Sequence, residues 1–254
     1  MGGVTRAAYV LLPPSESKVP GGRLQAAPGV FDVALGPSRA RVLQAMGDLV
    51  ANATPQELSK VLRVRGALLE RALEATRQLV EARAPVMPAW QRYNGVVWTH
   101  LDPASLTQRH RRRILVPSGL YGLSSATDLV GDYRLTMKVG LPGIGNVATF
   151  WRASLAETLA QTLAGQSGAR LVNLLPQEHR GAIGHHDSLA SRVIDVAFLR
   201  DGEGAAGHDA KAVKGVVARR VIDEGVEALD GFRWGPWRGR RREGRYEVVQ
   251  DASS

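Results

Sequence analysis

The feature that most constrains the fold is a short apolar run, residues 8–12 (AYVLL), that ends directly at Pro13 and Pro14. Such a run, bounded by prolines, is typical of a buried strand. Because proline fixes its own φ and restricts the residue before it, the direction in which the chain leaves this strand is set. The polar side chains held at that edge of the sheet are Ser15, Glu16, Ser17 and Lys18.

Strand ends of this kind often line a ligand crevice, so residues 15–18 form a candidate site. Lys18 is suited to contact a phosphate group or, if it is desolvated, to act as an amine base or nucleophile. A solvated loop is the alternative interpretation. We expect the strand to place an ammonium group and hydrogen-bonding groups at the mouth of a cleft.

The next part of the chain carries signals for helices. Thr54, Pro55 and Glu57 combine a capping hydroxyl, a proline at the first helical position and a carboxylate at the third, which predicts a helix to about residue 62. A further helix is expected at about 67–83, and an earlier one is expected to begin at Ser38. Together these helices form a predicted helical segment at 38–84.

Beyond this segment, strand and helix patterns alternate irregularly. Strands are predicted at 114–116, 133–137, 170–174, 193–199 and 245–250, and helices at 150–164 and 210–224. This spacing is unlike that of a barrel or a doubly wound sheet. We expect a single mixed α/β domain over residues 1–254, with the helical segment inserted after the first strand and a loose tail at 251–254.

The composition narrows the class of partner. The 254 residues carry a formal net charge of +9 and include no cysteine. A positive net charge favours anionic partners such as nucleic acid, nucleotides or phosphorylated metabolites, although basic enzymes are also common. Disulfides, thiolate zinc sites and cysteine nucleophiles are excluded. No apolar run has membrane-spanning length, so we expect a cytoplasmic protein with no membrane partner.

Two short motifs in the middle of the chain suit ligand binding. Ser118, Gly119, Tyr121 and Gly122 lie in the sequence SGLYG, whose exposed amides would cradle an anion; a tight turn with a core tyrosine is the alternative. The serine precedes both glycines, so this is not a nucleophile elbow. Ten residues after the turn, Asp132 and Arg134 would share one face of a strand, with Tyr133 on the other. That pair suits either substrate binding or a structural ion pair.

The most concentrated basic group is predicted on a helix near the end of the chain. His208, Lys211, Gly215 and Arg219 would share one helix face, with Lys214 beside it. A glycine inside a helix costs about 1 kcal/mol relative to alanine, which is accounted for if a ligand or another strand approaches the backbone there. The histidine and the lysines suit phosphate binding or proton shuttling. A solvated helix face is the alternative.

Several segments suit nucleic-acid binding. One is the turn between the second and third predicted helices; a second is the stretch LPGIG at 141–145, which matches the turn of a helix-hairpin-helix element but follows a predicted strand. Two arginine-rich patches lie at 109–113 and 232–245, and the latter interleaves tryptophans. The residues predicted to contact nucleic acid are Arg63, Arg65, Gly66, Arg111, Arg112, Arg238 and Arg240. The cluster His185-His186-Asp187 lacks a second spaced group, so we expect no bound metal.

In order along the chain, the motifs LLPPSESK, SGLYG, DYRL, the Phe150-Trp151 pair and HxxKxxKGxxxR resemble those of the YaaA family, also known as DUF328 and UPF0246, a group of peroxide-stress proteins. The resemblance covers nearly the whole chain. The form PPSESK and the stretch LPGIG suggest a divergent member of the high-GC bacterial branch. Departures occur at Gly95-Val96-Val97-Trp98 and at Ser125-Ala126-Thr127-Asp128, and they suggest a divergent copy recruited to a specialised pathway.

The resemblance implies a compact mixed α/β fold with a helix-hairpin-helix element and a positively charged cleft. It also implies DNA binding and a role in limiting intracellular iron and oxidative DNA damage. Our first functional hypothesis is therefore a stress-linked protein that binds DNA or nucleotide-like anions. The alternative is an enzyme of a specialised biosynthetic pathway that acts on a small anionic substrate in the same cleft.

Under either hypothesis, loops near positions 15, 120 and 210 are expected to meet around one electropositive hollow. The candidate catalytic residues are Lys18, Lys211, Tyr121 and His208. The candidate ligand-binding or phosphate-binding residues are Ser15, Glu16, Ser17, Ser118, Gly119, Gly122, Asp132, Arg134, Lys214 and Arg219. We expect no cofactor, and the sequence leaves the oligomeric state and the existence of an enzymatic activity open.

Overall fold

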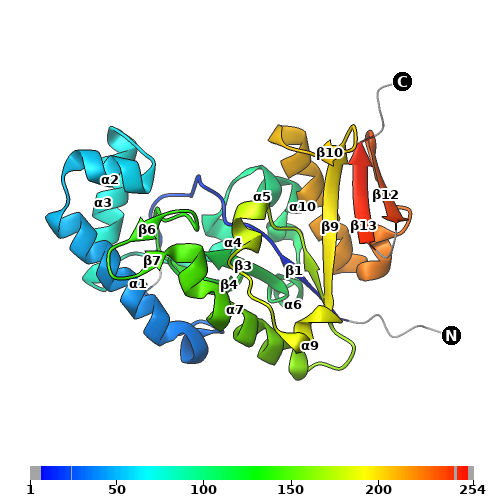
Figure 1. Ribbon diagram of the computed structural model, residues 1–254, viewed down its shortest axis with the longest axis horizontal. Coiled ribbons are helices and arrows are strands. Elements are labelled where there is room, and N and C mark those ends of the chain that lie inside the picture. Colours follow the sequence, from blue (N-terminus) through cyan, green and yellow to red (C-terminus); the bar gives the residue numbers. More distant parts are fainter. Residues whose placement is uncertain (1–6, 24, 243–244, 251–254) are drawn as a thin grey trace.

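The structure is a computed structural model that describes residues 7–23, 25–242 and 245–250; the loose tail predicted at 251–254 lies outside them. Within the described residues nine strands form one mixed sheet, in the order β11-β12-β13-β9-β8-β1-β3-β4, with β10 paired to β9 (Figure 1). The strands of this sheet are β1 (Ala8–Leu11), β3 (Ile114–Ser118), β4 (Gly122–Ser125), β8 (Arg170–Asn173), β9 (Val193–Arg200), β10 (Glu203–Gly204), β11 (Arg233–Trp234), β12 (Trp237–Arg242) and β13 (Arg245–Gln250). The predicted mixed α/β class is confirmed.

The centre of the sheet is parallel. Strand β1 pairs in parallel with β3 on one side and with β8 on the other, and β8, β9 and β13 continue the parallel pairing. All four residues of β1 are buried, as expected of a strand that is covered on both faces. The carboxyl ends of these strands therefore lie along one edge of the sheet.

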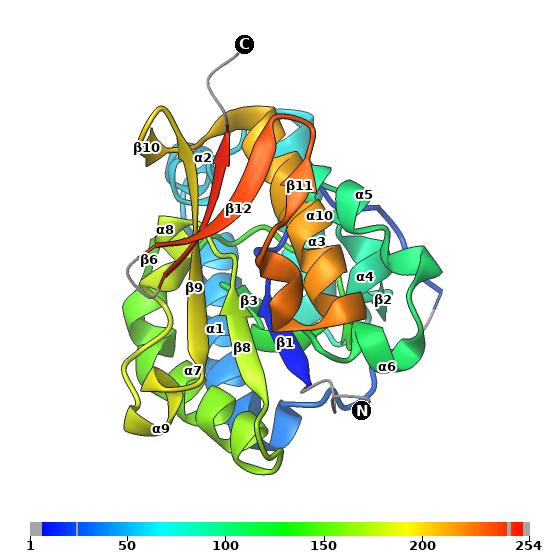
Figure 2. The same ribbon diagram turned by 90° about the vertical axis from the view of Figure 1, so that its right-hand side faces the viewer.

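Helices cover both faces of this sheet. Figure 2 shows α5 and α10 on one side of the parallel strands and α7 and α9 on the other. The helices are α1 (Asp32–Asn52), α2 (Pro55–Leu62), α3 (Ala67–Val80), α4 (Ala89–Arg92), α5 (Val96–Leu101), α6 (Gln108–Arg111), α7 (Val147–Ala164), α8 (Gln177–Arg180), α9 (Asp187–Ala190) and α10 (Gly207–Glu224), with 3₁₀ turns η1 (Pro103–Ser105) and η2 (Val226–Leu229). Within the described residues, no helix has the length and apolar character that a bilayer-spanning helix needs.

The helices α1, α2 and α3 follow β1 in the chain and lie together at one end of the molecule (Figure 1). The predicted capping box of α2 is present, with Thr54 and Glu57 each bonded to the other's backbone N–H. Helix α1 begins six residues before the expected start at Ser38 and contains Pro37. The helix extends because it buries Phe31 and Leu35, so packing outweighs the local proline signal.

The strand predicted at 133–137 is wrong, because these residues pair with no other strand. They run as an irregular segment in which Tyr133, Leu135 and Met137 are buried and the residues between them are partly exposed. Alternate burial of an extended segment produces the same period-two pattern as a strand, without a hydrogen-bonded ladder. The sequence pattern therefore predicted the buried residues of this segment correctly, but not its lack of strand pairing.

Two small strand pairs complete the fold. One joins β2 (Met87–Pro88) to β5 (Leu129–Val130), and the other joins β6 (Gly140–Leu141) to β7 (Gly145–Asn146). The stretch LPGIG at 141–145 thus forms a tight β-hairpin that leads into α7, with a β-strand where a helix-hairpin-helix element would have its first helix. The strand expected before this stretch, at 133–137, is absent, and the first strand of the hairpin, β6, begins only at Gly140.

Candidate functional site

The candidate site lies where three central strands end. Strand β1 lies between β3 on one side and β8 on the other. The next strands in the chain are therefore added on opposite sides of β1, which makes this position a topological switch point of the sheet. Ligands in open α/β sheets bind at such switch points, outside the carboxyl ends of the strands. The segments at this edge are the loop 13–18 after β1, Ser118 at the end of β3 and Asn173 at the end of β8.

The loop 13–18 is held by the chain between α4 and α5. The Trp98 indole N–H donates to the Pro13 carbonyl at 3.1 Å, and the Asn94 N–H donates to the Ser15 hydroxyl at 3.1 Å. Gly95 allows this approach, since a Cβ there would lie 2.9 Å from the Ser15 Cβ. The loop is therefore an ordered part of the fold, and the alternative of a solvated loop does not describe it.

Lys18 is the central residue of the site, and only 7% of its surface is exposed. Its Nζ donates to the Ser15 carbonyl at 2.9 Å and lies 4.3 Å from the centre of the Tyr133 ring and 5.8 Å from that of Tyr93. Burial lowers the pKa of Lys18 to about 7, while Asp132 opposes this shift and Arg134 adds to it. A lysine in this state exchanges a proton near neutral pH.

Hydroxyl groups form a chain beside this amine. The Tyr93 and Tyr133 hydroxyls are 2.8 Å apart, and the Ser118 side chain is hydrogen-bonded to Tyr133. Burial raises the pKa of both tyrosines, so their hydroxyls stay protonated. The Tyr121 ring packs edge-on against Tyr133, but its hydroxyl accepts the Gly131 N–H at 2.8 Å. Ser118, Tyr133 and Tyr93 thus provide alternating donors and acceptors next to Lys18.

Two ion pairs border the cluster. Arg71 binds Asp132, with its Nε 2.8 Å from the carboxylate, and Arg134 binds Glu16 at 3.2 Å. The expected pairing of Asp132 with Arg134 on one strand face is therefore wrong, because the segment is not a strand and each residue has another partner. Ser17 contributes its carbonyl, which accepts a hydrogen bond from the Ser15 hydroxyl.

A second group of charges lies around His179, which is 8% exposed. Burial lowers the pKa of His179 to about 4, the Glu178 carboxylate opposes this shift, and Glu16 and Lys214 also act on it. Burial lowers the pKa of Lys214 to about 8, with Arg180 and Lys211 adding to the shift. Glu16 from the first loop and Lys214 from α10 are thus close enough to His179 to influence the same ring.

Other predicted site residues have structural contacts. A Cβ on Gly119 would lie 2.7 Å from the Leu135 carbonyl, and one on Gly122 would lie 2.6 Å from the Trp151 ring, so protein atoms cover both glycines. Gly215 faces α5, where a Cβ would lie 2.3 Å from the Val97 carbonyl. The expectation that a ligand or strand approaches this helix backbone is therefore wrong, and the close neighbour is another helix.

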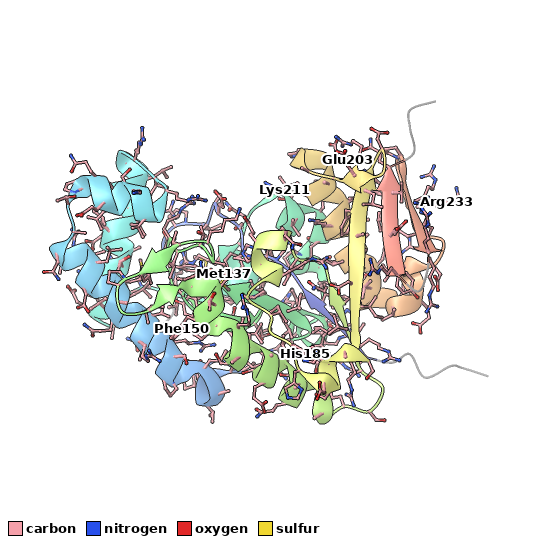
Figure 3. All side chains as sticks on the ribbon, viewed as in Figure 1. Met137, Phe150, His185, Glu203, Lys211 and Arg233 are labelled. Atoms are coloured by element: carbon pink, nitrogen blue, oxygen red, sulfur yellow. The ribbon has the colours of Figure 1, made fainter. Side chains whose placement is uncertain are left out.

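His208 and Arg219 also point toward neighbours outside the Lys18 cluster. The His208 ring lies 6.4 Å from that of His100 and nearly perpendicular to it. Arg219 donates to the Ser105 hydroxyl at 2.6 Å and pairs with Asp223. On α10, Lys214 acts electrostatically on His179, and Lys211 acts on Lys214. Figure 3 shows Lys211 in the upper half of the view and His185 in the lower half.

The residues predicted to bind nucleic acid do not form one surface. Arg63, Arg65 and Gly66 lie in the α2–α3 turn, at the opposite end of the molecule from Arg238 and Arg240 on β12 (Figure 1). Arg111 stacks on the Trp90 ring at 4.2 Å and donates to two carbonyls, whereas the adjacent Arg112 is exposed.

Two hollows are prominent on the surface of the described residues, and neither is lined by residues 15–18, 118–122 or 208–219. One of about 890 Å³ lies between the α1–α2 region and the β6–β7 hairpin, and Arg63 and Lys138 are among its lining residues. The other, of about 330 Å³, is lined in part by Arg71 and Asp132 and adjoins the Lys18 loop. The single electropositive hollow expected from the sequence is neither of these two. Lys18 and Ser118 both contact Tyr133, and Lys214 of α10 acts electrostatically on His179.

Sequence reasoning missed several residues of the site. Tyr93 and His179 carry no motif, and Arg71 was not distinguished from other surface arginines. Tyr133 was placed on the face away from the charged pair. Each of these residues reaches the site from a segment that is distant in the chain, so no local spacing could have identified them.

The fold and this arrangement define a single-domain mixed α/β protein whose central parallel strands end at a buried lysine–tyrosine cluster. The protein-family model described as Peroxide stress protein YaaA matches residues 9–239. The chain belongs to this family, which confirms the resemblance found in the sequence.

Relatives from several bacteria agree with this assignment. A UPF0246 protein of Streptomyces coelicolor is 33% identical over 226 residues, which cover 85% of this chain and 84% of that protein. A UPF0246 protein of Corynebacterium efficiens is 32% identical over 158 residues, 61% of this chain and 62% of that protein. One from Idiomarina loihiensis is 29% identical over 193 residues, 71% and 74% of the two chains. Similar proteins from high-GC bacteria are therefore among the relatives, and the family is associated with peroxide stress.

Proposed function

We propose that this protein binds a small nucleotide-like or phosphorylated anion beside Lys18, as part of a role in the response to peroxide. One observation carries the proposal. Lys18 is buried and Lys214 is partly buried, and among the described residues neither has a carboxylate within ion-pair distance. A buried charge is costly unless it is paired, so a bound anion is the partner that this arrangement lacks.

The surrounding charges support an anion. Arg180 and Lys211 lie close enough to Lys214 to lower its pKa, so three cations gather at the start of α10 and the end of α8. The carboxylate nearest to Arg180 is Asp195, which it already binds. A phosphate group would relieve the mutual repulsion of these cations, and the hydroxyls beside Lys18 would contact the rest of the ligand.

Thermal shift assays with AMP and with pyrophosphate test this proposal. A ligand at 100 times its Kd stabilises the folded state by about 2.7 kcal/mol, which raises Tm by several degrees. We expect the shift to be lost in Lys214→Met and reduced in Lys18→Met. The matched control Lys60→Met, on exposed α2, should keep it. Equal shifts in all four proteins would refute the assignment of this site.

DNA binding is a second candidate function, and the α2–α3 turn favours it. Helix α3 is preceded by Gly66 at its N-cap position, with a φ of 54° and no side-chain cap, so the N–H groups of Ala67 and Leu68 are placed to donate to phosphate oxygens. Arg63 and Arg65 are exposed beside these amides. The neighbouring hollow is lined by the carboxylates of Glu57 and Asp48 as well as by basic residues. These carboxylates would repel phosphate groups, so the DNA contact would be confined to the turn itself.

Fluorescence anisotropy with a labelled duplex tests this second function. The double variant Arg63→Gln/Arg65→Gln should weaken binding and reduce the slope of log Kd against log salt by about 1 to 2. The control Arg77→Gln/Arg220→Gln removes the same charge from exposed helix positions. If both double variants weaken binding equally, net charge explains the affinity and the turn is not the contact.

A further inference from the structure

We propose that Lys18 is an amine nucleophile that condenses with an aldehyde or ketone carrying an anionic group, to form an imine. This inference rests on the proposed function, because the anionic group would occupy the charges around Lys214. It adds a reaction and a substrate class to what would otherwise be a binding site.

The first argument is the position of the carboxylates around Lys18. Asp132 and Glu16 are the acidic groups that act on its ammonium, but Arg71 binds the first and Arg134 binds the second. Arg71 also donates to the Lys18 carbonyl at 3.0 Å, which fixes the pair next to the lysine. Each carboxylate is therefore occupied by a guanidinium group, and neither is bonded to the amine.

The second argument is the enclosure of the amine. The Tyr133 and Tyr93 rings lie on its apolar sides, and the single hydrogen bond to the Ser15 carbonyl orients it. A neutral amine that donates one hydrogen to this carbonyl keeps its lone pair for a carbon electrophile. Exclusion of water also favours the imine, because water is the product of its formation and the reagent of its hydrolysis.

The protonation state agrees with this geometry. An ordinary lysine is almost fully protonated at neutral pH, so it attacks carbonyl carbon only slowly. Burial lowers the pKa of Lys18 to about 7, so close to half of the molecules hold the reactive neutral amine at that pH.

The reaction balances without an oxidant or a further reactant. The Nζ lone pair forms a bond to the carbonyl carbon, and the carbonyl oxygen takes up a proton to give a carbinolamine. Loss of the second nitrogen hydrogen and of the C–O bond then gives the imine and one water. The hydroxyls of Tyr133, Tyr93 and Ser118 are placed to pass the proton to the departing oxygen, since each is bonded to the next.

Reductive trapping tests the inference on the full chain. The protein is incubated with glyceraldehyde 3-phosphate and sodium cyanoborohydride, and adducts are mapped by peptide mass spectrometry. We expect the Lys18 peptide to be labelled about tenfold faster than any surface lysine, with a rate that rises as the pH increases through 7. Lys18→Arg should abolish this adduct, whereas the surface control Lys138→Arg should retain it. The comparison of lysines within the wild-type protein stands even if a Lys18 variant does not fold.

The outcomes separate this inference from the proposed function. Labelling spread evenly over surface lysines, or unchanged in Lys18→Arg, would overturn the imine. If AMP or pyrophosphate still shifts Tm but Lys18 is not trapped, the anion site stands and the imine fails. If glycolaldehyde, which has no phosphate, labels Lys18 as fast as glyceraldehyde 3-phosphate and no anion shifts Tm, the nucleophile stands and the anion site fails.

Discussion

Lys18 shows how one residue combines a structural cost with a chemical use. Its ammonium is removed from water without a carboxylate partner, so the charged form destabilises the fold. The unfolded chain keeps the ordinary pKa near 10.5, while the folded chain has a pKa of about 7. Between these pH values the unfolded state holds a proton that the folded state lacks, and stability therefore rises with pH across this window.

This linkage gives a prediction at the residue scale. Between pH 7 and pH 9, wild-type protein should gain about 2 kcal/mol more free energy of unfolding than Lys18→Met, which has no amine to titrate. Urea unfolding of both proteins at the two pH values measures the difference. Parallel pH dependence in the two proteins would show that the amine is not desolvated.

At the scale of elements, the contact of α10 with α5 depends on Gly215. A Cβ there would lie 2.3 Å from the Val97 carbonyl and 2.8 Å from the His100 Cβ, both of which are fixed by α5. We predict that Gly215→Ala destabilises the protein by about 3 kcal/mol, although alanine is normally the better helix former.

Gly47 in α1 is the matched control for this substitution. Its added Cβ would meet a methyl group of Val80 at 3.1 Å, and Val80 is 46% exposed and free to move. Thermal unfolding should show a change within about 1 kcal/mol for Gly47→Ala. A Gly215→Ala protein as stable as the control would mean that the two helices do not pack as closely as described.

The hairpin of β12 and β13 carries an unfavourable pair. Arg242 lies directly opposite Arg245, whereas Arg240 lies opposite Glu247 and is bonded to it at 2.8 Å. Like charges in facing positions destabilise a ladder, and opposite charges stabilise it. We predict that Arg242→Glu stabilises the protein by about 0.5 kcal/mol and that Arg240→Glu destabilises it by a similar amount. Chemical denaturation of the two variants should give shifts of opposite sign.

At the scale of the whole molecule, Arg92 joins segments that are distant in the chain. This fully buried guanidinium donates to the carbonyls of Val19, Pro85 and Val130, at distances of 2.5 to 3.3 Å. Burial lowers its pKa, and the three carbonyls provide the partners for its N–H groups. The loop after β1 is thereby fixed to the chain that precedes β2 and to β5.

Removing this side chain should affect the whole fold. Arg92→Met would remove the guanidinium donor from one buried carbonyl, that of Val130, and from two partly buried ones, and we expect a loss of about 3 kcal/mol, with a lower Tm. Arg77→Met, at an exposed position on α3, should change stability by less than about 0.5 kcal/mol. A small effect in both variants would show that the loop holds its place without Arg92.

The sequence by itself determined the elements that depend on local signals. The apolar run that ends at Pro13 specifies β1 and the position of Lys18, and the Thr54 capping box specifies the start of α2. The apolar runs at β3, β8, β9 and β13 likewise need no distant partner to be identified. Hydrophobic periodicity, proline positions and capping residues depend on neighbours within a few residues, so the sequence alone is enough to identify them.

Only the tertiary structure decided which of these elements meet. The order of the parallel strands brings Ser118 to Tyr133, whose ring lies beside Lys18. The chain between α4 and α5 brings Tyr93 into the site from some 75 residues away in sequence. An alternation of apolar and polar residues, as at 133–137, arises from alternate burial alone as well as from strand pairing. The sequence pattern is the same in both cases, so it did not distinguish them. The pKa of Lys18 follows from burial by Tyr93 and Tyr133, and burial is a property of the assembled fold that no local sequence signal encodes.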